Sequence, residues 1–263
     1  MVKYQKDNEL MYGFNSIVKE HDHAEQMMMD FDVYKGKNEV LCLREKEKEI
    51  AVILFSGKIQ LIWENKNAIV ERKDVFEDGP YVLHVSKDVE IQIKFLLESE
   101  IGIQRATNEK KFESKLYLPT DCKEQCVGEK IVGGTAKRII RDIFKYDNAP
   151  YSNLVMGEVI TFPGKWSSYP PHYHEQPEVY FYKFTKKQGF GAGYVGDDVF
   201  KLKENSALLI TGGKSHPQVA APGYGMYYCW MIRNLPDNPW LERVDEEEHK
   251  WLFDENAEIW SKD

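Results

Sequence analysis

The feature of this sequence that most restricts its fold is a long series of short β-type segments separated by turn residues. Apolar or alternating stretches recur at residues 32–35, 40–43, 49–56, 58–63, 81–85, 89–94 and 101–105. Gly, Pro, Asn and Asp occupy the breaks, as at residues 35–38, 56–58 and 77–80. Strands at this spacing predict a β-sandwich or a β-barrel.

A second series of the same kind fills the rest of the chain. Its segments are residues 137–144, 154–162, 178–184, 191–195, 199–203, 206–210, 218–220 and 226–232. Residues 118–134, which include Pro119, Asp121, Gly128, Gly133 and Gly134, are expected to form the linker. We therefore predict an all-β protein with two jelly-roll domains, residues 1–125 and 126–263. The acidic stretch 237–253 has the period of a helix.

Charge and composition exclude several classes of protein. Lys and Arg number 35 against 43 Asp and Glu, so the net charge is −8, which argues against a nucleic-acid groove. No apolar run approaches the ~18 residues of a membrane span, and the N-terminal residues lack the apolar core of a secretory signal. We expect a cytoplasmic protein with no nucleic-acid or membrane partner. Cys42, Cys122, Cys126 and Cys229 are predicted to be free thiols.

Four residues in the second half have the spacing of a metal site. His172 and His174 are two residues apart, so on a strand their imidazoles would point to the same face. A Gln-Pro turn follows, and Glu178 opens the next strand, which can return its carboxylate to the same point. His216 ends a glycine-containing turn and could add a third imidazole. This set suits zinc, manganese, iron or nickel.

Other histidines and one other carboxylate offer weaker candidates. Glu175 competes with Glu178, but on a strand it would have the opposite alternation, so an orienting role is the alternative. The first half has its own His21-Asp22-His23, followed by Glu25, in a polar setting without a converging partner. We interpret these as solvated loop residues and His84 as a structural strand residue. The N-terminal domain is thus expected to lack metal ligands.

Several strings in the sequence are distinctive: residues 74–83, 138–143, 157–161, 216–224 and above all Trp166-Ser-Ser-Tyr-Pro-Pro-His172-Tyr-His174. These strings resemble the 5-deoxy-glucuronate isomerases of inositol breakdown. The resemblance implies a bicupin with the metal, zinc or manganese, in its C-terminal domain. The ligands carry over onto His172, His174, Glu178 and His216. It also implies conversion of 5-deoxy-glucuronate into 5-dehydro-2-deoxygluconate in myo-inositol catabolism.

Residues 178–182 also resemble the deoxy-hexosulose-uronate ketol-isomerases of pectin breakdown. The short segment between His174 and Glu178 and the indole of Trp230 are nearer to that sister group, and Thr211 replaces the proline usual before the Gly-x-x-His turn. The resemblance therefore leaves two uronic acids as possible substrates, one from inositol breakdown and one from pectin breakdown. A sugar- or metal-binding bicupin without catalysis and an iron dioxygenase are further alternatives.

Isomerisation moves a proton between neighbouring carbons, which requires a base. Glu175 or a metal-bound hydroxide is the candidate base, and Tyr180 and Tyr182 share the alternation of Glu178 and could face the substrate. Arg233, Lys183 and Lys165 are candidates to bind the substrate carboxylate, since cations near the motif suit that role. Tyr228 is a candidate wall residue. Exposed sheet edges allow a homo-oligomer.

Overall fold

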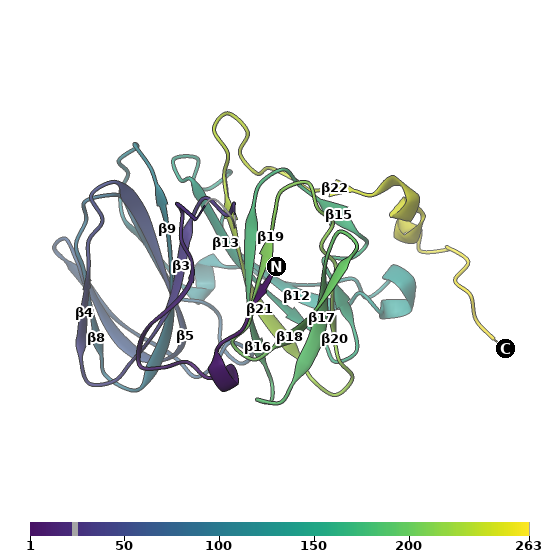
Figure 1. The fold of residues 1–263 in the computed structure, drawn as a ribbon, viewed down its shortest axis with the longest axis horizontal. Helices are drawn as coiled ribbons and strands as arrows, with labels where there is room; N and C mark the ends of the chain where they lie inside the picture. Colours follow the sequence, from purple (N-terminus) through teal and green to yellow (C-terminus); the bar gives the residue numbers. More distant parts are fainter. Residues whose placement is uncertain (23–25, 263) are drawn as a thin grey trace.

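The structure is a computed structural model that describes residues 1–22 and 26–262, and it forms two β-rich halves side by side (Figure 1). The strands of the first half are β2 (Gly13–Val18), β3 (Asp30–Gly36), β4 (Val40–Leu43), β5 (Lys48–Trp63), β6 (Lys66–Arg72), β7 (Val82–Val85), β8 (Ile91–Phe95), β9 (Ser99–Thr107) and β10 (Lys115–Tyr117). They form a nine-stranded sheet in the order β10-β7-β5-β9-β3-β2, to which β6 and β8 attach along β5, and β4 along β8.

The second half contains three sheets. Its strands are β1 (Val2–Lys3), β11 (Glu124–Val127), β12 (Arg138–Phe144), β13 (Leu154–Thr161), β14 (Trp166–Ser167), β15 (His172–Tyr173), β16 (Glu178–Phe184), β17 (Phe190–Val195), β18 (Asp198–Lys203), β19 (Ala207–Ile210), β20 (Gln218–Ala220), β21 (Met226–Arg233) and β22 (Val244–Asp245). The sheet orders are β1-β19-β16-β21-β13-β12-β11, β14-β20-β17-β18 and β15-β22. Every strand pair among the described residues is antiparallel, so the predicted all-β class is confirmed.

One predicted turn is wrong, because β5 runs without a break through Gly57. The strand pairs with β7 and β9 before this residue and with β6 and β8 after it. Gly57 has a φ of +99°, and a Cβ there would lie 2.2 Å from Ser99 Oγ. Only glycine fits this crossing point, where backbone from two strands meets.

Two further predictions need correction. The expected helix over 237–253 is instead the short strand β22 followed by the 3-10 helix η4 (Glu247–Phe253). Pro239 interrupts the helical pattern, since it lacks an N–H group and restricts the residue before it. The expected linker 118–134 contains η2 (Pro119–Asp121), β11 and η3 (Ile131–Gly134). Strand β11 pairs with β12, so this stretch is part of the second half's large sheet.

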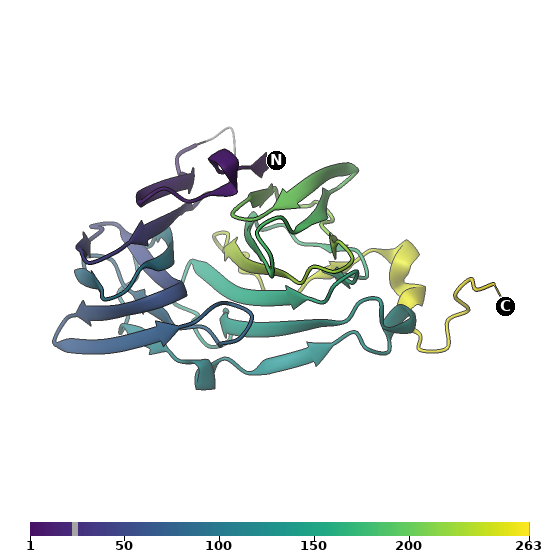
Figure 2. The same cartoon turned by 90° about the horizontal axis from the view of Figure 1, so that it is seen from below.

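The two halves lie against each other (Figure 2), and side chains from one face of β16 and β21 form part of the contact between them. Phe181 of β16 contacts the first half, with ring centroids 5.3 Å from Phe55 and 5.7 Å from Phe31. The neighbouring side chains of Tyr180 and Tyr182 point the other way, into the second barrel. This alternation decides which residues can reach the candidate site.

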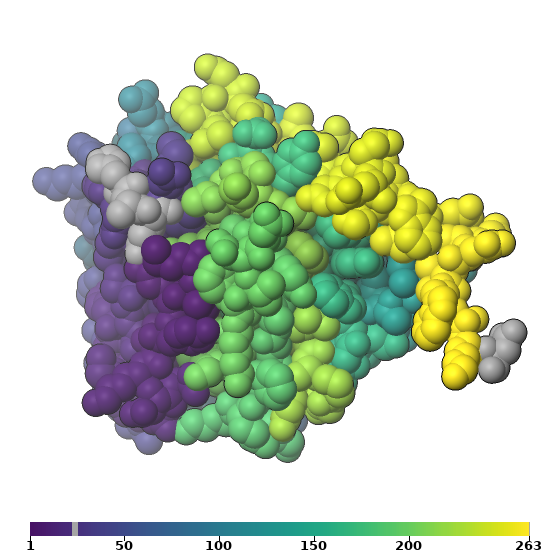
Figure 3. All heavy atoms as spheres, turned by 45° about the vertical axis from the view of Figure 1, so that its right-hand side comes forward, coloured from purple at the N-terminus to yellow at the C-terminus, as the bar shows by residue number. Residues whose placement is uncertain are grey.

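The first residues of the chain lie against the second half (Figure 3). Strand β1 pairs with β19, and the Met1 amine donates to Leu209 O at 3.0 Å. The N-terminal residues therefore complete the edge of the second half's sheet, and the division of the chain at residue 125 stays a prediction.

The interior of the first half is apolar and closely filled by aliphatic and aromatic side chains. His84 is buried in β7, where its Nε2 lies 2.7 Å from Glu49 Oε2, so its predicted structural role is supported. His21 is exposed, and the predictions for His23 and Glu25 lie outside the described residues. All four cysteines are free. None of the described helices has the length and apolar character needed to span a membrane.

Candidate metal centre

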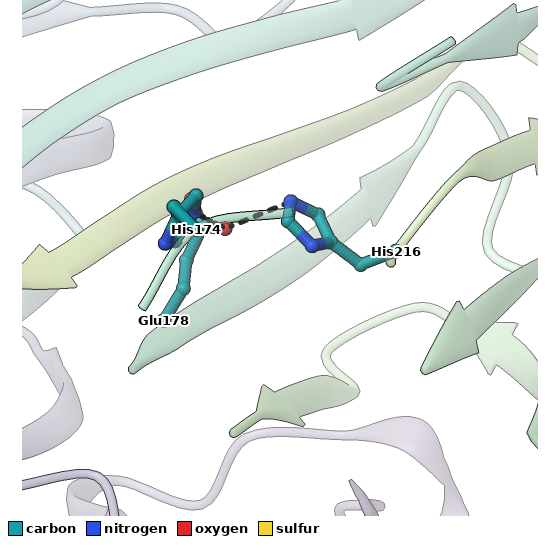
Figure 4. Close-up of side chains that lie close together, drawn as sticks. All are labelled: His174, Glu178 and His216. Atoms are coloured by element: carbon teal, nitrogen blue, oxygen red, sulfur yellow. Dashed lines mark hydrogen bonds and ion pairs between the residues drawn. The ribbon is translucent and has the colours of Figure 1, made fainter. Parts of the chain in front are cut away.

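Three buried side chains gather inside the second barrel (Figure 4). Glu178 is the first residue of β16, and its Oε2 lies 3.2 Å from His174 Nε2 and 3.4 Å from His216 Nε2. Each of the three residues offers a potential ligand atom within 4.8 Å of the others. A second group of acidic and histidine side chains among the described residues, Glu246, Glu248 and His249, lies at the half-exposed surface of η4.

The glycine turn after β19 fixes His216 relative to His174. A Cβ at Gly212 would lie 1.9 Å from Glu175 O, so the turn packs directly on the backbone of the histidine segment. Gly213, with a φ of +75°, donates its N–H to His174 O at 2.7 Å. The glycine pair therefore permits the close approach that brings the two imidazoles together.

Backbone carbonyls hold two of the imidazoles in a defined tautomer. His172 Nδ1 lies 3.0 Å from Pro170 O, and His216 Nδ1 lies 2.8 Å from Lys214 O. Because a carbonyl oxygen only accepts, each Nδ1 carries a proton and donates it, which leaves Nε2 as an acceptor. Burial lowers the pKa of His172 and of His216, so both rings are neutral near pH 7.

The arrangement fits a divalent cation. The neutral His216 Nε2 and the Glu178 carboxylate are both acceptors, yet they face each other at 3.4 Å in a buried setting. A cation between them would turn this unfavourable contact into two ligand bonds. His172 lies at the edge of the group, with its ring centroid 5.1 Å from that of His216. The ligand atoms of His174, Glu178 and His216 thus converge on one point, and the His172 ring lies beside this group of three.

The site opens into a cavity of about 180 Å³. Tyr180 and Tyr228 form part of its wall, with ring centroids 4.4 Å apart and each hydroxyl 3.2 Å from Ser168 Oγ. Burial raises the pKa of Tyr180 well above its ordinary value and that of Tyr228 to about 12, so both hydroxyls keep their protons at neutral pH. They can donate hydrogen bonds but are poor bases.

Three residues predicted for the substrate or the proton lie elsewhere. Glu175 is exposed and borders another hollow beside Thr211. Lys183 lines a hollow of about 530 Å³ between the two halves, where its Nζ donates to Asn205 Oδ1 at 2.6 Å. Arg233 donates to Met28 O at 3.1 Å. Lys183 and Arg233 have the opposite strand alternation to Glu178 and Ile232, so their side chains lie on the face of the sheet that points away from the candidate site.

Tyr182 faces the barrel interior as predicted, but it lies deep in the core. Its hydroxyl donates to Gln218 Oε1 at 2.7 Å, and the side chain has no exposed surface. This supports a packing role rather than contact with a ligand.

The cavity also contains residues that the sequence predictions missed. Arg138 of β12 and Arg243, just before β22, line it together with Asp142, Trp230 and Trp240. Arg138 belongs to the string 138–143 that carried part of the family resemblance, and its alternation with Ile140 was a usable signal. Strand alternation could not identify Arg243 and Trp240, because both lie in a segment without regular secondary structure, about 100 residues after β12.

Comparison with known proteins gives consistent results. The KduI/IolB family profile matches residues 5–252. A protein of Geobacillus kaustophilus named 5-deoxy-glucuronate isomerase is 29% identical over 240 residues, which cover 80% of this chain and 84% of that protein.

Solved structures share the fold. An IolB-like protein of Salmonella typhimurium LT2 superposes with a TM-score of 0.85 at 20% identity, covering 95% of this chain and 98% of that one. An oxalate decarboxylase of Lactobacillus farciminis superposes with a TM-score of 0.64 at 10% identity, covering 90% and 85%. The bicupin architecture is thereby confirmed.

Proposed function

Because this chain belongs to the KduI/IolB family, we propose that it is a metal-dependent aldose–ketose isomerase that converts 5-deoxy-glucuronate into 5-dehydro-2-deoxygluconate in myo-inositol catabolism. The observation that carries the proposal is the convergence of His174, Glu178 and His216 at the wall of a buried cavity. The curated relatives named for this reaction cover most of the chain, which supports the same substrate.

The proposed ligands of the metal are His172, His174, Glu178 and His216, and zinc or manganese is the proposed ion. A divalent cation bound by these groups would act as a Lewis acid on the carbonyl oxygen of the sugar. The ligand set supports this assignment because imidazole nitrogens and a carboxylate oxygen are the groups that bind such ions.

The cavity wall supplies the groups that would orient the sugar. Tyr180, Tyr228 and Ser168 form a connected set of hydroxyls. Since both phenols keep their protons, they would donate hydrogen bonds to the sugar oxygens. Besides Glu178, the described residues of the cavity wall include one other carboxylate, that of Asp142. Asp142 therefore replaces Glu175 as the candidate base that moves the carbon-bound proton.

A second candidate substrate is the deoxy-hexosulose-uronate of pectin breakdown. One observation favours it: Trp230, the residue that resembles that sister group, lies in the cavity wall with its ring centroid 5.6 Å from that of Trp240. Both reactions would use the same ligands, and the indole pair would select between the two sugar acids by shape.

A deuterium-exchange assay tests the proposal. The purified protein is incubated in deuterated water with 5-deoxy-glucuronate or with the pectin-derived ketouronate, and proton NMR follows product formation and exchange at the carbon next to the carbonyl. We expect conversion of 5-deoxy-glucuronate, loss of that conversion after chelation, and recovery with zinc or manganese. Conversion of the ketouronate alone would show that the second candidate is the substrate. If neither acid shows exchange, the proposed isomerase activity is wrong and a non-catalytic sugar- or metal-binding role is favoured.

A further inference from the structure

Two arginines line the candidate metal cavity, and the proposed reaction as argued so far uses neither. Arg138 is 6% exposed, and its Nη1 donates to Ala136 O at 2.8 Å. Among the described residues no carboxylate lies within ion-pair distance of this guanidinium. A buried guanidinium has five N–H donors, so most of the hydrogen-bonding capacity of Arg138 is unused by the protein.

The second arginine is placed by the strand pair β15-β22. In this pair His172 lies opposite Asp245, and Glu246 N donates to Pro171 O at 3.0 Å. Arg243 directly precedes β22, and its Nε lies 2.9 Å from Asp245 Oδ1. The segment that carries Arg243 is therefore bonded to the segment that carries the proposed ligand His172, which fixes the guanidinium relative to the metal site.

The two positive charges act on each other. Burial lowers the pKa of Arg138, and the charge of Arg243 lowers it further. Asp245 already lies beside Arg243, whereas Arg138 has no carboxylate partner among the described residues, so an anion in the cavity would bring the missing counter-charge to Arg138.

We infer that Arg138 and Arg243 together bind the carboxylate of the sugar-acid substrate and so determine specificity for uronic acids. The inference rests on the proposed function: the carbonyl end of the sugar lies at the His and Glu ligands, and the carboxylate end lies at the arginines. Arginine suits this role better than lysine, because its planar N–H groups match the two carboxylate oxygens. Arg233 and Lys183 are excluded, because neither lines this cavity and both donate to protein oxygens elsewhere.

The test compares 5-deoxy-glucuronate with its methyl ester, which keeps the shape but lacks the charge. Arg138→Met and Arg243→Met are measured by titration calorimetry and by steady-state kinetics on the metal-loaded protein. We expect each substitution to weaken binding of the acid, and to raise its KM, by about 10- to 100-fold, the loss expected for hydrogen bonds to a charged group. Binding of the ester should change little, and the bound metal should remain at its wild-type stoichiometry.

Two further variants separate a binding role from a structural one. Arg138→Lys and Arg243→Lys keep the charge and should recover part of the affinity for the acid. Arg44→Met is the matched control, since it removes an exposed Arg–Asp pair of similar geometry, with Arg44 Nε 3.0 Å from Asp88 Oδ1, far from the site. This control should bind acid and ester as the wild type does.

The outcomes distinguish this inference from the proposed function. If both methionine variants keep the wild-type ratio of acid to ester affinity, the carboxylate is bound elsewhere and the inference is wrong. Because Arg243 is partly exposed, Arg243→Met alone decides the question if Arg138→Met fails to fold: an unchanged ratio of acid to ester affinity in that variant contradicts the inference. If the wild type binds the acid through the arginines but never converts it, the inference holds and the proposed isomerase activity fails.

Discussion

Arg72 and Glu158 form a two-bonded ion pair across the two halves of the molecule, and neither side chain has any exposed surface. The Nη1–Oε1 distance is 2.8 Å and the Nη2–Oε2 distance is 3.0 Å. Tyr227 donates its hydroxyl to the same carboxylate at 2.6 Å, and Arg72 also donates to Asp78 O. The pair therefore ties β6, the 73–80 loop and β13 together.

Glu158→Gln should lower the free energy of unfolding by about 3–5 kcal/mol, because it leaves the buried charge of Arg72 without a counter-charge. Urea denaturation followed by circular dichroism measures the change. The double variant Arg72→Met/Glu158→Gln should lose less than the sum of the two single variants. Glu71→Gln, in the exposed pair with Lys58, is the control and should cost at most about 1 kcal/mol. Equal losses for the buried and the exposed pair would contradict this account.

Removal of one proposed ligand should abolish metal binding without unfolding the protein. Loss of a group that only hydrogen-bonds to a metal ligand can lower metal affinity by roughly 100-fold. We expect His216→Ala, which removes a ligand itself, to lower the affinity by more than that. Elemental analysis after dialysis, together with the thermal shift on adding zinc or manganese, measures this. His21→Ala is the control, because His21 is an exposed histidine of the first half. Retention of one full equivalent of metal by His216→Ala would refute the ligand assignment.

Glu204 should make stability depend on pH in a direction opposite to that of an ordinary salt-bridged carboxylate. Burial raises its pKa above 4.5, although Lys183 and the N–H of Phe184 act against the shift. The folded state therefore holds a proton that the unfolded state releases above this pH, so the contribution of Glu204 to stability falls as pH rises. Glutamine can still accept the 2.7 Å hydrogen bond from Phe184 N but does not titrate.

We expect the stability of Glu204→Gln relative to the wild type to increase between about pH 4.5 and pH 7. Urea denaturation at several pH values across this range measures the difference. A constant difference, or one that decreases with pH, would show that the Lys183 pair outweighs the cost of burial.

Gly57→Ala should be among the most destabilising single-methyl additions in the chain. The new Cβ would lie 2.4 Å from Glu98 O, and the φ of +99° is unfavourable for any L side chain. We expect a loss of about 2–4 kcal/mol, the sum of a left-handed backbone cost and overpacking. Gly13→Ala is the matched control: its φ is +88°, but nothing lies within 4 Å of the added atom, so only the backbone cost applies. Similar losses of stability for the two variants would show that steric overlap at position 57 contributes nothing.

The sequence by itself determined the all-β class, most strand positions and the grouping of His174, Glu178 and His216. These features depend on local rules: alternation along a strand, turn residues between strands, and a fixed spacing between a histidine pair and the next strand. Lys183 and Arg233 were wrongly predicted to bind the substrate, although the same rule of alternation argued against them: both are odd-numbered positions in strands whose even-numbered residues face the cavity.

Only the tertiary structure decided which cations face the site. Arg138 and Arg243 are more than one hundred residues apart in the chain, and their meeting depends on the pairing of β15 with β22. The burial of Glu158 against Arg72 likewise depends on how two separate sheets pack. Local periodicity carries no information about such contacts, because they arise from the docking of distant elements, and that docking is set by the whole core rather than by any one segment.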